Sequence, residues 1–342
     1  MLVCKIKKDF KNFKLDVDFE MENERLGFLG ASGSGKSLTL KAIGGLIKPD
    51  SGKIILNGRT LFDSEKKINL KAQDRKVGYL FQDYALFPNF TVEENVKAGL
   101  RDRADITDKL KEMHIYHIKD KLPAYISGGE RQRTALCRIL VNKPDILLLD
   151  EPFSALDEFL KNSIEAEVLN IIRKYDLKTI LVSHNKDEVY RMSDKIISIS
   201  HGKSGGLKET RDFFENPTSL TEAKLIGINN FSDFEIVKDE IFLKAWGIRL
   251  KTKTKIKTEA NLCALRSRDI ILSDRALNDD FIKIQDFRLI ENIDSFLIIL
   301  NQDHKKYDDL RIEIDKEEYK EFHDGPKYFA IDSRKLLFLK EE

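Results

Sequence analysis

The glycine-rich stretch GASGSGKS at positions 30–37 constrains this chain more than any other feature of its sequence. It matches the pattern G-x-x-x-x-G-K-[ST], follows the apolar run LGFL and precedes the helical run SLTLKAIGGL. Between a strand and a helix, such glycines let backbone N–H groups surround a phosphate, while the lysine reaches the outer phosphate oxygens. The residues that we predict to bind a nucleotide here are Gly30, Ala31, Ser32, Gly33, Ser34, Gly35, Lys36 and Ser37.

The pattern of apolar runs changes near residue 212. Before that point, short runs such as RLGFLG and PDILLLDEP alternate with helical stretches, which indicates an α/β fold with a parallel sheet buried on both faces. Residues 91–144 have helical spacing, which predicts a helical subdomain inserted into the α/β unit. From residue 230 onward, alternating strands such as SFLIIL and KLLFLK predict a separate small all-β domain.

Composition restricts the partners that we expect. The 342 residues carry a net charge of +1, which gives no general attraction to nucleic acid or anionic membranes, so no nucleic-acid partner is expected. Three cysteines, Cys4, Cys137 and Cys263, lack zinc-type spacing and fit a reducing cytosol. The start MLVCKIKKDFK lacks the apolar core of a signal peptide, and no apolar run is long enough to span a bilayer. If the protein serves a membrane, we expect it to dock to another component.

A second motif, ILLLDEP at 146–152, places two carboxylates after a buried apolar strand. Asp150 then emerges at the carboxyl end of a parallel strand, where α/β sheets hold their ligands. There Asp150 is suited to hold the magnesium shell, and Glu151 is suited to polarise a water molecule toward the γ-phosphate. A solvated strand end is the alternative interpretation of this acidic pair.

Two further polar residues follow buried strands that are predicted to end at the same edge. Gln82, after VGYLF, is placed to contact the metal and the attacking water, and His184, after TILVS, is placed to hydrogen-bond the γ-phosphate. A surface amide and a structural histidine are the alternatives. The predicted catalytic residues are therefore Glu151, His184 and Gln82, and the predicted magnesium ligands are Ser37, Gln82 and Asp150.

The stretch ISGGERQR at 126–133 predicts a second helix start suited to an anion. One γ-phosphate cannot occupy two helix N-termini of the same chain, but two chains can exchange them across a symmetric contact. SALD at 154–157 follows the acidic pair, and an ordinary helix cap is its alternative interpretation.

In this order, GASGSGKS, LFQDYALFP, ISGGERQR, ILLLDEP, SALD and LVSH make residues 1–222 resemble the nucleotide-binding subunit of ATP-binding-cassette (ABC) transporters. The resemblance implies a P-loop NTPase cassette with a RecA-like parallel sheet, a head-to-tail homodimer, and ATP and Mg²⁺ as cofactors. It also implies that Phe10 stacks on the adenine, with Phe13 as a competitor. The other nucleotide-binding residues that it implies are Ser127, Gly128, Gly129, Glu130 and Asp157, the first three of them at the partner's γ-phosphate.

The stretch GRTLFDSEKKINL followed by RKVGYLFQ is similar to the importer branch that serves molybdate and related oxyanions. This resemblance implies a linker at 223–229 and a C-terminal regulatory β-barrel at 230–342, related to oligonucleotide/oligosaccharide-binding and molybdate-binding modules. Such modules enter a strand with Ser-x-Arg-Asn, whereas residues 282–285 read IKIQ, without the hydroxyl or the arginine. The barrel is therefore expected, whereas oxyanion sensing by it stays open.

We therefore expect the ATPase subunit of a molybdate or tungstate importer, bound peripherally at the cytoplasmic face of the cell membrane. Closure of the dimer around Mg-ATP is expected to push on integral-membrane permease subunits beside QDYALFP, and an extracytoplasmic solute-binding protein is an indirect partner. Importers of sulfate, ferric iron or polyamine share this cassette and are alternatives. A soluble ABC ATPase without a transport role is a more distant alternative.

Overall fold

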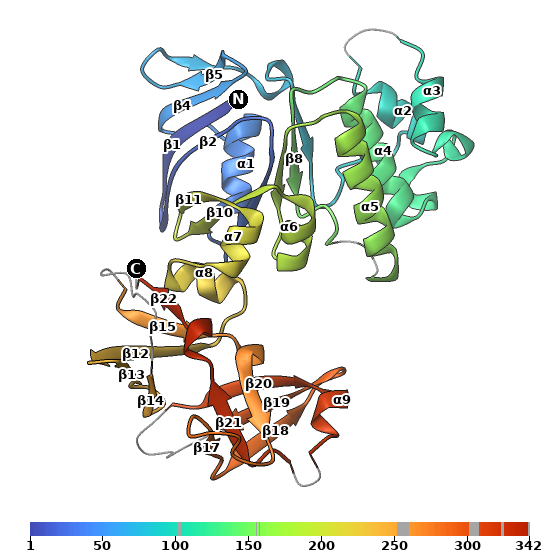
Figure 1. The fold of residues 1–342 in the computed structure, drawn as a ribbon. Helices are drawn as coiled ribbons and strands as arrows, with labels where there is room; N and C mark the ends of the chain where they lie inside the picture. Colours follow the sequence, from blue (N-terminus) through green and yellow to red (C-terminus); the bar gives the residue numbers. More distant parts are fainter. Residues whose placement is uncertain are drawn as a thin grey trace. The chain divides into compact units, whose positions relative to one another are not determined.

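The computed structural model describes residues 1–100, 104–154, 156, 158–251, 260–300, 308–322 and 325–340. The chain forms two compact units, Met1–Arg211 and Asp212–Glu342, each with its own hydrophobic core (Figure 1). The division falls where the pattern of apolar runs changes along the sequence.

Within the described residues, the first unit contains an eleven-stranded sheet in the order β6-β5-β4-β1-β2-β11-β10-β3-β9-β8-β7. The part from β10 to β7 is parallel, as the near-continuous apolar runs predicted. Every residue of β8 and β9 is buried, so both faces of these strands are covered. The parallel strands are β3 (Arg25–Leu29), β7 (Val77–Leu80), β8 (Ile146–Asp150), β9 (Thr179–Val182) and β10 (Lys195–Ser200).

The remainder of this sheet is mainly antiparallel and adds to the predicted parallel sheet. The first hairpin alternates buried and exposed residues, with Lys11 and Asn12 in the turn between its strands. This alternation is typical of antiparallel strands with one covered and one solvated face. The strands are β1 (Leu2–Phe10), β2 (Phe13–Met21), β4 (Ser51–Leu56), β5 (Arg59–Asp63), β6 (Ile68–Asn69) and β11 (Lys203–Glu209).

Helices cover the parallel strands. α1 (Lys36–Gly44) packs on β7, β8 and β9, and α6 (Lys186–Met192) packs on β3 and β9. Gly27 of β3 permits the approach of α6, because a Cβ atom there would lie 2.5 Å from Val189 Cγ1. α5 (Glu158–Lys174) follows β8 along the chain.

Residues 91–144 contain helices and 3-10 turns and no strand in the described part, which agrees with the predicted helical insertion (Figure 1). Thr91 and Glu94 form a capping box at the first of these helices, since each side chain accepts the other residue's backbone N–H. The helices are α2 (Val92–Lys97), α3 (Thr107–Glu112) and α4 (Gly128–Leu140), with turns at Tyr116–Ile118 and Pro123–Tyr125.

The second unit begins within α7 (Thr210–Glu215) and continues with α8 (Leu220–Leu225). α8 extends into the stretch that was expected to be a linker, because the Ser219 side chain accepts the Glu222 N–H and starts a helix there. The N–H of Leu220 also donates to the carbonyl oxygen of Lys340 at 3.2 Å, which ties this segment to the end of the chain.

Three small sheets make up most of the second unit in the described residues, so the prediction of a small all-β domain is confirmed. Trp246 and Phe329 are almost fully buried in their shared core. The first sheet contains β12 (Asn230–Val237), β13 (Glu240–Leu243), β14 (Ile248–Lys251), β15 (Leu262–Leu265) and β22 (Leu337–Leu339). The others contain β16 (Ile270–Ser273), β17 (Ile282–Lys283) and β21 (Tyr328–Ile331), and β18 (Phe287–Glu291), β19 (Ser295–Leu300) and β20 (Leu310–Asp315), which α9 (Lys316–Tyr319) follows.

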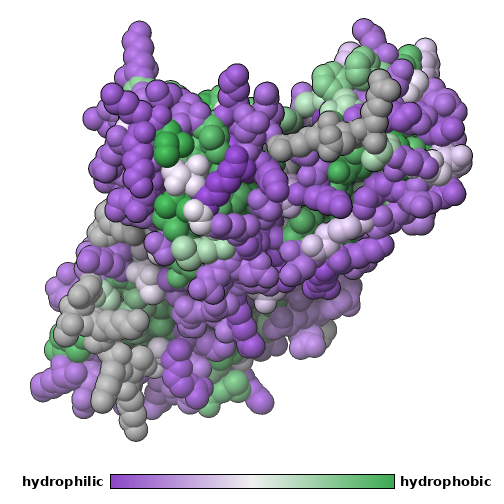
Figure 2. All heavy atoms as spheres, turned by 90° about the horizontal axis from the view of Figure 1, so that it is seen from above, coloured by the Kyte–Doolittle hydropathy of each residue, from purple (hydrophilic) through white to green (hydrophobic). Residues whose placement is uncertain are grey.

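Figure 2 shows a face where hydrophilic residues dominate and hydrophobic residues form small separate areas. None of the described helices is both long enough and apolar enough to cross a bilayer. Cys4, Cys137 and Cys263 are buried free thiols, and burial raises the pKa of Cys137 and of Cys263 to about 12.

Candidate active site

The glycine-rich loop joins the end of β3 to the start of α1. Gly33 and Gly35 have φ angles of 74° and 109°, which residues with a side chain rarely adopt, so both positions favour glycine. Lys36 Nζ donates to the carbonyl oxygens of Gly30 and Ala31 at 2.6 and 2.9 Å, which draws the loop around the helix start. No side chain caps α1, so the N–H groups of its first turn are suited to an anion.

The strand ends bring two of the predicted magnesium ligands together. Ser37 Oγ donates to Asp150 Oδ1 at 2.6 Å. The Tyr79 hydroxyl donates to the other oxygen, Asp150 Oδ2, at 2.8 Å, and burial and the Asp150 charge raise the pKa of Tyr79. A hydroxyl and a carboxylate are hard oxygen ligands, so this pair fits Mg²⁺. Gln82, the third predicted ligand, lies in an exposed turn two residues beyond the end of β7.

Glu151 and His184 meet at the carboxyl ends of β8 and β9. Glu151 Oε2 lies 3.3 Å from His184 Nδ1, and the two side chains are 26% and 65% exposed, so water reaches the pair. The Glu151 backbone has a φ of 49°, a strained left-handed conformation for a residue with a side chain. Three hydrogen bonds hold it there. The Glu151 N–H donates to the Val182 carbonyl oxygen at 2.9 Å, and the Glu151 carbonyl oxygen accepts from the Ser154 hydroxyl at 2.9 Å and from the Ser154 N–H at 3.3 Å.

The predicted signature loop forms the N-terminus of α4. Ser127 Oγ accepts the Glu130 N–H at 3.3 Å, and Glu130 Oε2 accepts the Ser127 N–H at 2.8 Å, which makes a capping box. The hydrogen bond from the Ser127 N–H to the carboxylate is the main cause of a lowered pKa of Glu130. Gly129 permits contact with α5, because a Cβ atom there would lie 2.8 Å from Ile164 Cδ1. The capping box engages the N–H groups of Ser127 and Glu130, whereas those of Gly128 and Gly129 have no intrahelical partner. This unit therefore contains a second helix start with N–H groups suited to phosphate.

The adenine contact and the role of Asp157 stay predictions. Phe10 and Phe13 are cross-strand partners in the first hairpin, with ring centroids 6.2 Å apart. Phe13 lies against the phosphate loop, since a Cβ atom at Gly35 would be 3.1 Å from its Cζ, whereas Phe10 has the Lys8 ammonium 5.4 Å from its ring centre. Both rings remain candidates for the adenine contact. Asp157 lies outside the described residues.

Arg75 supports this site, and sequence reasoning missed it. Its side chain is fully buried and donates to the carbonyl oxygens of Ala42 and Ile43, at the C-terminus of α1, at 2.7 and 2.8 Å. It also donates to the Leu70 carbonyl oxygen and to Asn69 Oδ1. Burial lowers the pKa of Arg75 to about 10, so at neutral pH a cation complements the negative end of the helix that starts at the phosphate loop.

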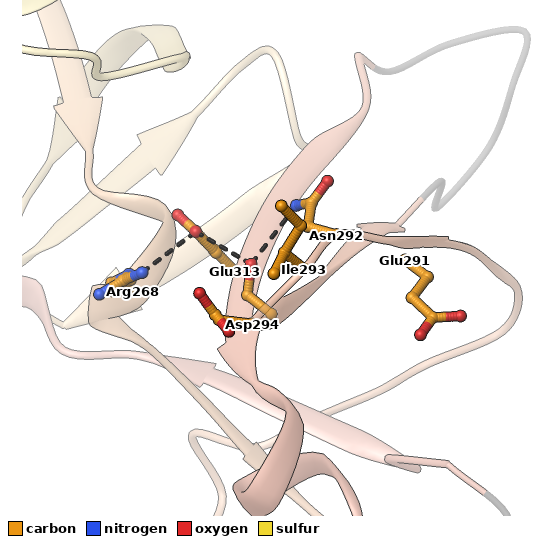
Figure 3. A pocket seen from close by; sticks show the side chains of 7 residues that line it. Arg268, Glu291, Asn292, Ile293, Asp294 and Glu313 are labelled. Atoms are coloured by element: carbon orange, nitrogen blue, oxygen red, sulfur yellow. Dashed lines mark hydrogen bonds and ion pairs between the residues drawn. The ribbon is translucent and has the colours of Figure 1, made fainter. Parts of the chain in front are cut away.

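The second unit contains an open hollow of about 760 Å³ beside the turn between β18 and β19. Figure 3 shows Arg268 directed at Glu313, to which it donates a hydrogen bond at 3.1 Å. The Ser295 hydroxyl donates to the same carboxylate oxygen at 3.2 Å. Glu291 and Asp294 also line the hollow. The Lys316 ammonium lies 2.5 Å from Glu291, so three carboxylates face two cations. The hollow is therefore slightly acidic, which does not favour an oxyanion.

Known proteins with similar sequence or fold agree with this geometry. Residues 12–154 match the family model described as ABC transporter. The glucose import ATP-binding protein GlcV of Saccharolobus solfataricus is 31% identical over 295 residues, which cover 82% of each chain. The molybdate/tungstate import ATP-binding protein WtpC of Pyrococcus abyssi is 34% identical over 280 residues, which cover 78% of each chain. A dimeric structure of a bacterial ABC transporter cassette has a TM-score of 0.52 at 26% identity and covers 62% of this chain and 99% of that one.

A phosphate loop on a parallel sheet, with a carboxylate and a histidine meeting beside it, defines an enzyme that hydrolyses a nucleoside triphosphate. The chain belongs to the ABC transporter family, among the cassettes that bind and hydrolyse ATP. The predicted family, fold class and ATPase activity are thereby confirmed. Other relatives are named as import ATP-binding proteins for sulfate/thiosulfate, spermidine/putrescine and Fe(3+) ions, so the relatives differ in substrate.

Proposed function

We propose that this chain is the ATPase subunit of an importer and that dimerisation around ATP drives uptake. One observation carries the proposal: a single unit has two helix starts suited to phosphate, at Lys36 and at Ser127. In the described residues, no hydrogen bond or ion pair joins Ser127 to the phosphate loop. A second copy of the chain is therefore the natural donor of the second helix start.

In the proposed reaction, Lys36 exchanges its contacts with the loop carbonyl oxygens for the β- and γ-phosphate oxygens. Ser37, Asp150 and Gln82 are suited to hold Mg²⁺, which supplies positive charge next to the phosphates when bound. Glu151 polarises the water that attacks the γ-phosphate, and His184, 3.3 Å from Glu151, hydrogen-bonds a γ-phosphate oxygen. Hydrolysis removes the group that bridges two chains and lets the dimer reopen.

At the proposed interface, Ser127, Gly128 and Gly129 of one chain contact the γ-phosphate held by the phosphate loop of the other. Glu130 keeps the helix start in shape through its capping box with Ser127. Asp157 belongs to the same interface in this proposal. The bacterial cassette with the similar fold is described as dimeric, which supports this arrangement.

The stretch QDYALFP and the turn after it form the proposed contact with the permease. Phe87 and Phe90 are 46% and 43% exposed, and their ring centroids lie 5.1 Å apart. The fully buried Asn95 side chain donates to both their carbonyl oxygens, and Arg138 of α4 donates to the carbonyl oxygen of Tyr84. Hydrogen bonds thus connect the segment of this exposed aromatic pair to α4, the helix that Ser127 caps. An exposed aromatic pair is suited to contact a partner, and its connection to α4 would couple that partner to the nucleotide.

We propose molybdate or tungstate as the transported substrate. Two molybdate/tungstate relatives, from Pyrococcus abyssi and Thermococcus kodakarensis, match over 78% and 84% of their own length, beyond the cassette alone. The glucose relative matches over 82% of its length, so glucose is the second candidate. The acidic hollow of the C-terminal domain does not favour oxyanion sensing, so a regulatory role of that domain would require another ligand or partner.

The dimer is tested with Glu151→Gln in the full chain. With ATP and Mg²⁺ we expect this variant to retain ATP and to elute from size-exclusion chromatography as a dimer, because the bridging γ-phosphate persists. Ser127→Arg in the same chain is expected to restore the monomer while ATP stays bound. A Glu151→Gln chain that binds ATP and stays monomeric would contradict the composite site.

The substrate and the partners need a separate test. We expect membrane fractionation to recover the chain peripherally with permease subunits, and recovery without any permease would favour a soluble ATPase. Calorimetric titration of the solute-binding protein that serves the same permease is expected to show tight binding of molybdate or tungstate. Tight binding of glucose, sulfate, iron or a polyamine instead would refute the proposed substrate.

A further inference from the structure

An ion pair between a buried carboxylate and a lysine whose side chain is 20% exposed lies next to the His184 segment, and no step of the proposed reaction uses it. Glu188, on α6, is 3% exposed. Its Oε1 lies 2.5 Å from Nζ of Lys161 on α5, and its Oε2 accepts a hydrogen bond from Ser183 Oγ at 2.6 Å. The two oxygens of one carboxylate thus reach two different segments of the chain.

At its Ser183 end, the network holds the backbone on both sides of His184. Ser183 is 2% exposed, and its Oγ also accepts the backbone N–H of Asn185 at 3.0 Å. The residues immediately before and after His184 are therefore held by one hydroxyl, which Glu188 in turn orients. Because the His184 side chain is 65% exposed, few neighbours restrain the ring, and the backbone on either side decides how far it stands from Glu151.

The Lys161 end connects the histidine segment to the carboxylate segment. Lys161 lies in α5, the helix that follows Glu151 along the chain. At the strand ends the same two segments are joined a second time, by the Glu151 N–H that donates to the Val182 carbonyl oxygen at 2.9 Å. Two separate links therefore maintain the 3.3 Å distance between Glu151 and His184.

We propose that Glu188 is a positioning residue for ATP hydrolysis: it holds His184 beside Glu151 through Ser183 and anchors that segment on Lys161. The inference rests on the proposed function, because it assumes that His184 acts on the γ-phosphate. An ion pair that is largely removed from water adds little stability compared with apolar side chains of the same size, so a geometric role accounts for this pair better than a stabilising one.

Glu188→Gln in the full chain is the first test, because glutamine keeps an acceptor for Ser183 and removes the charge that holds Lys161. We expect kcat for ATP hydrolysis to fall roughly tenfold, as for other side chains that orient functional groups, with KM for ATP changed less than about twofold. Lys161→Met is the matched change from the other side of the pair and is expected to have the same effect. Unchanged kcat in both variants, with normal thermal unfolding, would overturn the inference.

The decisive comparison uses the His184→Ala background, in single-turnover reactions with excess enzyme so that slow hydrolysis can be measured. If Glu188 acts through His184, adding Glu188→Gln there lowers the rate no further. A second tenfold loss would show that Glu188 acts independently of His184, and the inference would be wrong. If His184→Ala itself keeps the full rate, the proposed role of His184 has failed, which is a different outcome from failure of the positioning role alone.

Discussion

Arg75→Met tests whether the buried guanidinium supports the helix of the phosphate loop. The substitution keeps much of the side-chain volume but removes the donors to all four acceptors of Arg75. The Ala42 carbonyl oxygen keeps the Gly45 N–H as a donor at 3.2 Å, and Asn69 is exposed to water. The loss therefore falls on the carbonyl oxygens of Ile43 and Leu70, which accept at 2.8 and 3.0 Å. A buried acceptor without a donor costs roughly 1 to 3 kcal/mol, and removal of a buried charge offsets part of that loss. For two such acceptors we expect the free energy of unfolding to fall by about 3 kcal/mol.

In calorimetry, this loss corresponds to a decrease of roughly 6 to 12 °C in the unfolding temperature of the first unit. Lys71→Met is the matched control, because Lys71 is exposed and, like Arg75, lies in the segment before β7. Its expected effect on the free energy of unfolding is below about 0.5 kcal/mol. ATP should still raise the unfolding temperature of Arg75→Met, since the loop itself is unchanged. A loss no larger than that of the control would refute the assigned role of Arg75.

Two further predictions concern stability. Gly45→Ala is expected to lower the free energy of unfolding by about 1 kcal/mol more than Gly58→Ala. The φ angles at the two positions are nearly equal, 79° and 78°, but only a Cβ atom at Gly45 would meet another residue, 2.6 Å from Arg75 Nε. Equal losses of stability in urea unfolding would contradict this clash. Hydrogen bonds, first from Lys174, lower the pKa of Glu112 from 4.5 to about 2. Because the folded pKa is depressed, its stabilisation is present above pH 4.5 and is lost as the pH falls to about 2, so we expect the stability difference between wild type and Glu112→Gln to shrink over that range. A pH-independent difference would show that Glu112 is not ionised in this way.

Local sequence determined the parts of the site that depend on backbone geometry and strand ends. A glycine-rich loop between a strand and a helix has few alternatives, so Lys36 and Ser37 could be placed without a structure. Apolar runs followed by polar residues located Asp150, Glu151 and His184, because parallel strands deliver their carboxyl ends to one edge. Their order along the chain also sufficed to indicate the family.

The alternation in the first hairpin was visible in the sequence, with Lys11 and Asn12 as its turn, yet it was not read as an antiparallel addition to the sheet. Strand order depends on pairing between segments far apart in the chain, and alternation alone does not name the partner. β2, for example, lies beside β11, whose residues come almost two hundred positions later.

Tertiary structure alone decided which side chains support the site. Arg75 reaches the C-terminus of α1, Tyr79 reaches Asp150, and Glu188 reaches Lys161, and in each case the partners are separated by many residues. A charged or phenolic residue looks the same in a sequence whether it is solvated or buried against a distant partner. Burial makes the difference, because only a side chain removed from water must find its hydrogen bonds inside the protein, and the fold as a whole decides which groups are removed.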